Sequence, residues 1–273
     1  MTPKFTTTVT IDDVRAAAKR IEGRIRRTPL LAANLVHDPL PANPTLNLKL
    51  ECLQVSGSFK ARGAMSALTS LDDAAKARGL ITASGGNHGL GVACAGHAAG
   101  VPVTIYLPGN TPPAKADNLR RWGAEVHMYG EVWDDANREA LAVAERDGKT
   151  YIHPFADPSV IAGQGTVSLE VLADAPDTDV LLVSIGGGGL IAGAAMAAKR
   201  DRDFYKLVQM VFQDPYGSLH PRHTVNTALL EPIKIHHLDR PRERISKVLE
   251  DVGLGPNFRF RFPHQLSGGQ RQR

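Results

Sequence analysis

Four consecutive glycines, Gly186–Gly189, are the feature that most constrains how this chain can fold. They lie between an apolar run at 180–185 and an apolar stretch that begins at Leu190. Glycines let several backbone N–H groups converge on one point, and the N-terminus of a following helix adds the positive end of its dipole. The order of strand, glycines and helix therefore favours a site for an anion such as phosphate. A flexible linker is the alternative, although linkers are not usually flanked by a buried-type strand and a small-residue helix.

Composition limits the class of protein. A length of 273 residues, with 42% hydrophobic and 22% charged residues, indicates a soluble globular protein of one large or two ordinary domains. No apolar stretch reaches the roughly 18–20 residues that cross a bilayer, so no direct membrane insertion is expected. Cys52 and Cys94 are the only cysteines. Because metal-binding spacings such as C-x-x-C are missing, we expect no metal site, and a cytoplasmic location.

Residue usage changes sharply near residue 201. Basic and acidic residues balance up to residue 200, whereas residues 201–273 carry the whole net charge of +4. The same stretch has a single alanine, Ala228, and half of the ten histidines. This change suggests two pieces of different origin. Nucleic-acid binding is not expected, because the basic residues are mixed with acidic ones and no RNA-binding signature occurs.

Strand and helix patterns alternate over the first two hundred residues. Such repeated βα units predict an α/β fold, with a parallel sheet covered by helices on both faces. Ligands of such sheets lie at the carboxyl ends of the strands, so the glycine turns at 85–86 and 186–189 are both expected at a binding edge. The predicted strands are 45–50, 79–83, 103–107, 125–128 and 180–185, and the predicted helices are 59–71, 87–99, 113–122, 132–146 and 159–172.

Lys60 is the candidate reactive residue. It follows Gly57, Ser58 and Phe59 at the predicted start of a helix. A lysine amine can form an imine with an aldehyde cofactor, and pyridoxal phosphate in addition needs a phosphate site. A surface lysine is the alternative when Lys60 is considered alone.

From about residue 10 to 200 the sequence resembles the fold-type-II pyridoxal-phosphate enzymes, in particular the serine/threonine dehydratase and serine racemase group. The resemblance implies tryptophan synthase β-like parallel sheets, with a smaller subdomain of about 52–150 inserted in a region 1–203. Five motifs, in the order and spacing of that group, carry the resemblance: Lys49-Leu50-Glu51, Gly57–Ala64, Ser84–Gly89, Gly163–Thr166 and Gly186–Gly189.

The resemblance also implies a cofactor, pyridoxal 5'-phosphate, and a role for each matching residue. Lys60 resembles the Schiff-base lysine that also moves the α-proton of the substrate, and Phe59 the residue packed beside the cofactor ring. Asn87 matches the residue that hydrogen-bonds the ring oxygen. The remaining roles are substrate-carboxylate binding by the backbone of Ser84, Gly85, Gly86 and His88, and phosphate binding by Gly186, Gly187, Gly188 and Gly189.

The implied reaction is β-elimination from a small amino acid, L-threonine or L-serine, to a 2-oxo acid and ammonia. Racemases of this group carry a second serine where Gly85 stands, and glycine cannot transfer a proton. Elimination is therefore favoured over racemisation, unless the loop alignment slips by one residue. A second copy of the chain is a candidate partner.

Residues 204–273 resemble a different family, the ATP-binding subunits of oligopeptide/dipeptide ABC transporters, from the glutamine loop to the signature motif. Gln213 matches the glutamine of that loop, and Ser267, Gly268, Gly269 and Gln270 match the signature. No complete phosphate loop occurs: Gly148-Lys149-Thr150 has its ending, but Val143 stands where its first glycine must be. The chain by itself is therefore expected neither to bind nor to hydrolyse ATP.

The sequence thus predicts a fusion of a truncated lyase region, 1–203, with a mostly helical ABC-ATPase fragment, 204–273. Activity is expected to be weak or absent, because no partner for the pyridine nitrogen is recognisable after residue 200. The alternatives are an ATP-binding transport component and an inactive remnant of both pieces. At the seam, residues 207–212 are predicted to form a strand parallel to 180–185, followed by helices near 225–235 and 240–252.

Overall fold

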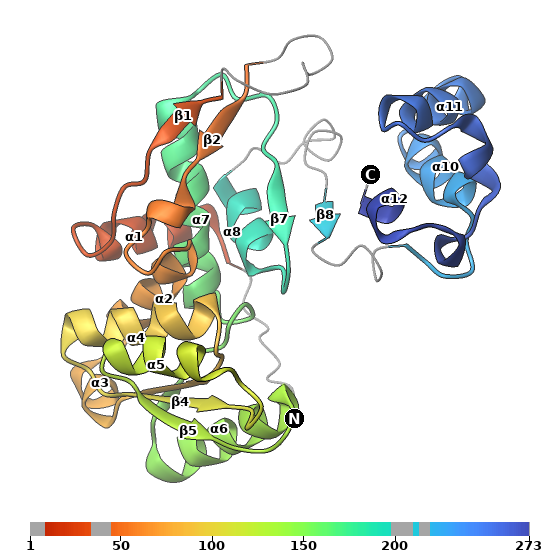
Figure 1. The fold of residues 1–273 in the computed structure, drawn as a ribbon. Helices are drawn as coiled ribbons and strands as arrows, with labels where there is room; N and C mark the ends of the chain where they lie inside the picture. Colours follow the sequence, from red (N-terminus) through yellow and green to blue (C-terminus); the bar gives the residue numbers. More distant parts are fainter. Residues whose placement is uncertain (1–8, 34–44, 198–209, 213–218, 273) are drawn as a thin grey trace. The chain divides into compact units, whose positions relative to one another are not determined.

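The computed structural model describes residues 9–33, 45–197, 210–212 and 219–272 (Figure 1). The chain divides into two units. The first unit consists of residues 1–181 and 187–204, and the second of residues 182–186 and 205–273. None of the helices within the described ranges has the length and apolar character that crossing a bilayer requires.

A parallel four-stranded sheet organises the first unit. Its spatial order is β5-β4-β3-β6, formed by Glu125–Met128, Val103–Leu107, Leu80–Ala83 and Thr150–Tyr151. Every residue of β3 is buried. This burial is typical of a central parallel strand, which helices cover on both faces.

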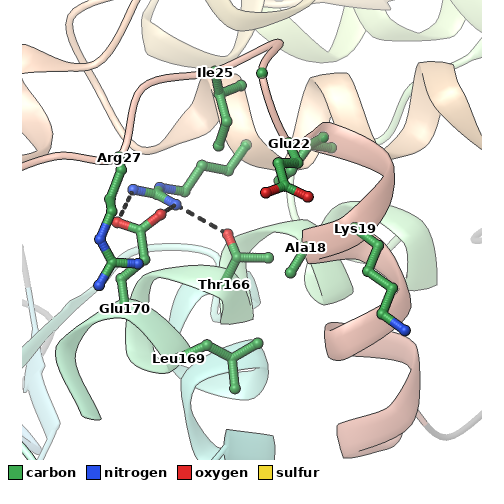
Figure 2. Close-up of a pocket in the computed structure, with 11 residues that line it drawn as sticks. Ala18, Lys19, Glu22, Ile25, Arg27, Thr166, Leu169 and Glu170 are labelled. Atoms are coloured by element: carbon green, nitrogen blue, oxygen red, sulfur yellow. Dashed lines mark hydrogen bonds and ion pairs between the residues drawn. The ribbon is translucent and has the colours of Figure 1, made fainter. Parts of the chain in front are cut away.

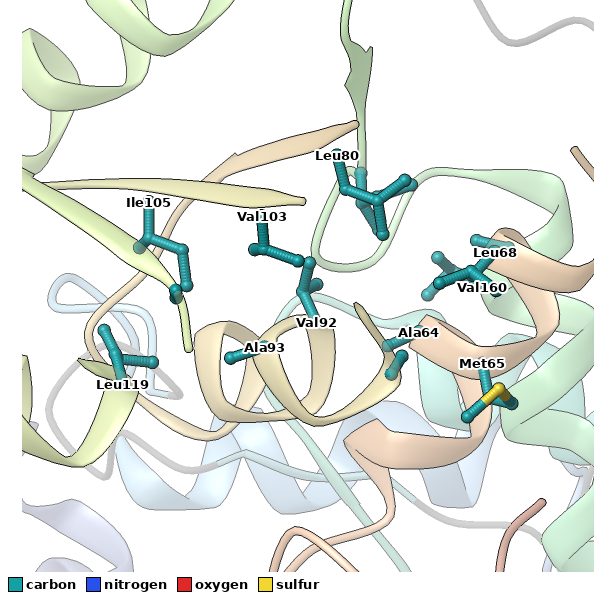
Figure 3. Packing of buried hydrophobic residues seen from close by; sticks show 14 of the residues in the cluster. Ala64, Met65, Leu68, Leu80, Val92, Ala93, Val103, Ile105, Leu119 and Val160 are labelled. Atoms are coloured by element: carbon teal, nitrogen blue, oxygen red, sulfur yellow. The ribbon is translucent and has the colours of Figure 1, made fainter. Parts of the chain in front are cut away.

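Helices cover the two faces of this sheet. Leu80, Val103 and Ile105 point to one face, where they pack with α2 (Lys60–Thr69), α4 (Asn87–Ala99) and α5 (Pro113–Arg121) in the main hydrophobic core (Figure 3). Ile81 and Ala83 alternate with Leu80 along β3 and pack against α6 (Trp133–Asp147) on the other face. The period-2 alternation of a strand thus separates the two layers.

Helices α1 (Ile11–Ile21), α7 (Pro158–Asp174) and α8 (Gly189–Ala197) pack on one another beside α2. α7 packs against both α2 and α8, and small residues permit this close approach. A Cβ on Gly163 would lie 2.6 Å from the Arg62 carbonyl oxygen of α2, and one on Gly165 would lie 2.7 Å from the Gly193 oxygen of α8. The remaining bounds are β1 Leu30–Ala32, β2 Asn47–Lys49, η1 Glu51–Leu53 and α3 Asp73–Arg78.

The second unit contains a small sheet and a group of short helices. β7 (Val183–Ile185) pairs in parallel with β8 (Met210–Phe212). A separate core forms around Ile245, Leu249 and Leu254. The helices are α10 Val225–Ile235, α11 Pro241–Asp251 and α12 Gly268–Gln272, together with the 3-10 turns η2 Pro256–Phe260 and η3 Pro263–Gln265.

Most of the predicted elements are confirmed. The parallel α/β fold is present, and the helices expected near 225–235 and 240–252 are α10 and α11. The strand expected at the seam is confirmed over 210–212, whereas 207–209 lie outside the described residues. Residues 180–182 were expected in a strand and are not in one, because the described pairing with β8 begins at Val183. Four elements, α1, α3, β1 and β6, were not predicted from the sequence.

Candidate active site

Lys60 is the first residue of α2, directly after a Phe59 N-cap. Its Nζ donates a hydrogen bond of 2.6 Å to the carbonyl oxygen of Pro154 and lies 5.3 Å from the centroid of the Phe59 ring. Burial lowers the pKa of the Lys60 amine, since it disfavours the charged form. A larger fraction of the amine is therefore neutral, and the neutral amine is the nucleophile.

The second glycine turn packs on Phe155, the residue after the acceptor of the Lys60 bond. A Cβ on Gly187 would lie 2.2 Å from the Phe155 ring, and one on Gly189 would lie 2.9 Å from its carbonyl oxygen. Gly188 has a φ of +86°, in the left-handed region that favours glycine. Helix α8 begins at Gly189, so this turn leads into a helix N-terminus, where anions are stabilised. Gly186 belongs to the other unit and is not placed against these residues.

The loop expected to bind a substrate carboxylate joins β3 to α4. Its Gly86 N–H donates a hydrogen bond of 3.3 Å to Ser84 Oγ, so the serine side chain folds back onto the loop. Gly85 is half-buried. Asn87, expected to face the cofactor ring, is the first residue of α4, and its side chain is exposed. Trp133 of α6 donates from Nε1 to the Ala83 oxygen at the end of β3, a contact that the sequence did not suggest.

His88 is buried behind this loop. Its Nε2 lies 3.1 Å from Thr82 Oγ1 and 3.0 Å from the Ile152 carbonyl oxygen. Desolvation by burial lowers the pKa of His88 to about 3, against the hydrogen bond to Ile152 that raises it. The imidazole is therefore neutral at physiological pH. Sequence resemblance assigned a role to the backbone of His88 and none to this side chain.

Arg62, two residues after Lys60, is the centre of a buried ion-pair cluster. Its guanidinium donates to Glu51 at 2.8 and 2.7 Å, and to Glu170 at 2.7 and 2.9 Å. Lys49 Nζ lies 2.5 Å from Glu170. Two cations thus balance two carboxylates, and the paired hydrogen bonds from Arg62 hold α2 in a fixed orientation against η1 and α7.

Both partners of the main ion pair remain charged at neutral pH. Burial by itself would raise the pKa of Glu170, but hydrogen bonds from Arg62 and Lys49 outweigh it, so this pKa lies below its usual value. Burial would lower the pKa of Arg62, but its bonds to Glu51 and Glu170 raise it. The Lys-Leu-Glu and Arg62 motifs were recognised in the sequence as parts of one family pattern, but their convergence with Glu170 was not predicted.

A cavity of about 320 Å³ lies beside the Arg62 cluster (Figure 2). Leu169, Thr166 and Glu170 of α7 line one side of it, and Lys19 and Glu22 lie on the side of α1. Its lining residues, all in the described part of the first unit, include none of those expected to bind the cofactor. This cavity is therefore distinct from the site around Lys60.

The residues that resemble the transporter signature use their side chains locally. Ser267 Oγ accepts a hydrogen bond of 3.3 Å from the Gln270 N–H, and Gln270 Oε1 accepts one of 3.0 Å from the Ser267 N–H. These reciprocal bonds cap α12, which contains Gly268 and Gly269. Gln213 lies outside the described residues.

The residues around Lys60 fit pyridoxal phosphate. A half-buried amine can react with its aldehyde, and the glycine turn, too tight for a Cβ at Gly187, offers backbone N–H groups to its phosphate. A parallel α/β fold with such a lysine and such a turn defines a pyridoxal-phosphate-binding class of protein. The sequence matches the family described as pyridoxal-phosphate dependent enzyme over residues 21–251, and the chain belongs to this family.

Individual relatives refine this assignment. The chain is 40% identical over 191 residues to an L-threonine ammonia-lyase of Thermotoga maritima, which covers 70% of this chain and 47% of the relative. It is 43% identical over 195 residues to an L-threonine ammonia-lyase of Geobacter sulfurreducens, with 71% and 48% covered. Among solved structures, maize serine racemase matches with a TM-score of 0.69 and 31% identity, over 83% of this chain and 66% of that one.

The extent of these matches bears on the expected fusion. The chain spans about half the length of the curated relatives it matches. The family match itself continues to residue 251, past the seam expected between 203 and 204. No transporter assignment for the C-terminal region is supported by these findings.

Proposed function

We propose that the protein is a pyridoxal-phosphate-dependent ammonia-lyase that acts on L-threonine or L-serine. The observation that carries this proposal is the position of the Lys60 amine, which is half-buried at the start of α2. The amine donates a hydrogen bond to the Pro154 oxygen, and the next residue, Phe155, packs on the glycine turn. Two relatives at 40% and 43% identity are described as L-threonine ammonia-lyases. The amino-acid substrate, a homodimer and a cytoplasmic location belong to the same proposal.

Each part of the site has a task in this reaction. Bound pyridoxal phosphate supplies an electron sink for the charge that develops at the substrate Cα. Lys60 Nζ removes the Cα proton, and its lowered pKa suits a general base near neutral pH. The backbone of the Ser84–Gly86 loop and of His88 binds the substrate carboxylate. Asn87 and Phe59 orient the cofactor ring, and the 186–189 turn holds its phosphate. The β-hydroxyl leaves as water and hydrolysis takes up one water, so the net products are a 2-oxo acid and ammonia.

Gly85 favours elimination over racemisation. A Cβ at this position would lie 3.3 Å from Leu107 Cδ2 and 3.4 Å from Thr111 Cγ2, which is tighter than most real contacts of a Cβ. The loop thus carries no side chain here that could exchange a proton, and its neighbours leave little room for one. Serine racemase remains the alternative activity, because maize serine racemase is 31% identical to this chain.

The domain division and the weak activity expected from the sequence are also part of this proposal. Both depend on the sequence alone. The domain division is a lyase region 1–203 with an inserted subdomain near 52–150, and weak activity is expected because no partner for the pyridine nitrogen is recognisable after residue 200. The resemblance of 204–273 to an ABC-transporter ATPase fragment is retained as a second proposal on the motifs of Gln213 and Ser267–Gln270. An inactive remnant is the third alternative.

One set of assays on the purified protein tests these alternatives. With added pyridoxal phosphate, the chain is expected to release 2-oxo acid from L-threonine or L-serine slowly, and faster than it forms D-serine. D-Serine formation that exceeds 2-oxo acid release would show that racemisation is the main reaction. Calorimetry is expected to detect no ATP binding, and micromolar binding would instead support the transporter assignment.

A further inference from the structure

The two residues that flank the Ser84–Gly86 loop are joined by their side chains. Thr82 lies on β3 before the loop, and His88 lies on the first turn of α4 after it. His88 Nε2 is 3.1 Å from Thr82 Oγ1 and 3.0 Å from the Ile152 carbonyl oxygen, and Thr82 Oγ1 donates to the same oxygen at 2.9 Å. These three atoms close the base of the loop and tie it to the segment that follows β6.

The partners of His88 determine its tautomer. A carbonyl oxygen can only accept a hydrogen bond, so Nε2, 3.0 Å from the Ile152 oxygen, must carry a proton. The Thr82 hydroxyl uses its own hydrogen toward Ile152, and its oxygen is thus free to accept from Nε2. Nδ1 is buried and has no hydrogen-bond partner among the described residues, so a proton on it would have no acceptor.

The segment that His88 holds also contacts the other parts of the site. Ile152 is two residues before Pro154, whose carbonyl oxygen accepts the hydrogen bond from Lys60 Nζ. Phe155 follows and packs against Gly187 and Gly189. A displacement of Ile152 would therefore move the partners of Lys60, of the glycine turn and of the substrate loop at the same time.

We infer that the imidazole of His88, as its Nε2–H tautomer, is a positioning residue that fastens the Ser84–Gly86 loop to the 152–155 segment and so fixes both relative to Lys60. This inference rests on the proposed function for its purpose, because the loop and the lysine are the parts that the reaction would use. The hydrogen bonds themselves do not depend on that function.

The surroundings keep this imidazole without charge. Desolvation is the main cause of its lowered pKa, and the nearby charges of Lys60 and His153 act in the same direction. A neutral ring adds no second cation beside the Lys60 amine. Its hydrogen bonds are consequently the same throughout the pH range in which an amino-acid lyase is assayed.

Nitrogen-15 NMR of histidine-labelled protein tests the tautomer directly. We expect the His88 signals to show the neutral Nε2–H form without titration between about pH 6 and 8, since the pKa of about 3 lies well below this range. The H88Q variant identifies the His88 signals by their loss. An Nδ1–H tautomer, or an imidazolium signal at pH 6, would overturn the inference. This measurement needs no cofactor and no turnover.

Hydrogen exchange tests whether His88 joins the Ser84–Gly86 loop to the 152–155 segment. H88L removes the donor, whereas H88Q retains an amide N–H at a similar reach. We expect H88L to speed exchange about five- to tenfold in both 83–89 and 152–157, the factor that corresponds to one or two neutral hydrogen bonds. H88Q should stay near the wild type. Unchanged exchange in either segment, or equal exchange in H88Q and H88L, would show that this donor does not join them.

A matched pair of threonine variants covers the case in which H88L does not fold. T82V removes the hydroxyl that bonds to His88 and Ile152, and T104V makes the same change at an equally buried position on β4, where the hydroxyl contacts Lys149 and Glu125. T82V should loosen 83–89 and 152–157, and T104V should not. Equal effects of the two variants on these segments would contradict the inference.

Uptake of pyridoxal phosphate separates this inference from the proposed function. Wild type and H88Q are expected to develop the visible absorption of lysine-bound cofactor, and H88L to load about tenfold more weakly. If the wild type takes up no cofactor, the proposed function fails, while the NMR and exchange results still decide the role of His88. If the wild type and H88L load equally well, His88 does not position Lys60.

Discussion

Arg62 in α2 and Arg244 in α11 are both ion-paired arginines, but in different surroundings. The side chain of Arg62 has no exposed surface and bonds to two carboxylates, whereas that of Arg244 is 48% exposed and its partner Asp239 is 70% exposed. Removing one partner of a buried ion pair strongly destabilises the protein, because the other charge stays buried without compensation. Exposed ion pairs contribute little to stability. Near Lys60, buried ion pairs thus fix the position of a helix. Around α11, the ion pair between Arg244 and Asp239 is exposed to solvent.

The hydrophobic core is also larger in the region around Lys60 than in the region around α11. Around α2 and β3, the main core joins strands and helices from residue 21 to residue 160. The described core around α11 has Ile245, Leu249 and Leu254 as its buried members. We therefore expect changes near Lys60 to have larger effects than chemically identical changes near α11, and matched substitutions can test this expectation.

The largest expected effect is at Lys60. K60A should abolish the visible absorption of lysine-bound pyridoxal phosphate and all turnover, because Nζ is the amine that would bond to the cofactor and remove the Cα proton. K234A, a change at an exposed lysine of α10, should leave both unchanged. Borohydride reduction followed by peptide mass spectrometry identifies the modified residue. Cofactor found on a different lysine would refute the assignment of Lys60.

The comparison of the two arginines predicts the next largest effect. R62M should destabilise the first unit by about 3–5 kcal/mol, because Glu51 and Glu170 would keep buried charges without their main partner. Both tryptophans, Trp122 and Trp133, lie in the first unit, so tryptophan fluorescence during urea unfolding reports on that unit. R244M should not measurably change the far-UV circular dichroism melt. Similar losses in the two variants would mean that burial does not distinguish these ion pairs.

Two glycine variants give a smaller contrast. G187A should cost about 1–3 kcal/mol of overpacking and weaken cofactor binding, since the added methyl would lie 2.2 Å from the Phe155 ring. Gly255, at the start of η2, has no atom within 4 Å of such a methyl, so G255A should be neutral. Adding F155A to G187A should restore cofactor binding, as measured by absorbance titration. A double variant that binds as weakly as G187A would rule out the contact with Phe155 as the cause.

The smallest expected effect is a dependence of stability on pH that arises from His88. The folded-state pKa of about 3 lies below the ordinary value of 6.5, so the unfolded chain takes up a proton between these values and the folded chain does not. Stability should therefore fall as the pH decreases below 6.5, by at most about 1.4 kcal/mol per pH unit. H88Q lacks this term and should show a shallower decline in urea unfolding between pH 6.5 and 5. Parallel curves for the two proteins would contradict a neutral buried imidazole.

Much of the local structure could be predicted from the sequence. The bounds of α4, β4 and β5 were predicted without error, because each is marked by its own apolar pattern and flanking glycines. The short β6 was missed. Two residues carry too little periodicity to indicate a strand, and its pairing with β3 comes from a neighbour some seventy positions away. Gly148, considered as part of a phosphate loop and rejected, is the left-handed C-cap of α6.

The sequence by itself determined the parallel α/β class, the lysine motif and the glycine turns, since these depend on residues close together in the chain. Only the tertiary structure decided what those residues contact. Lys60 and Pro154 are 94 positions apart, and Arg62 and Glu170 are 108 apart. Periodicity and spacing record which face of an element is apolar, but not which distant polar group it meets. Burial then sets the protonation of Lys60, Glu170 and His88, because desolvation acts only where the folded chain excludes water.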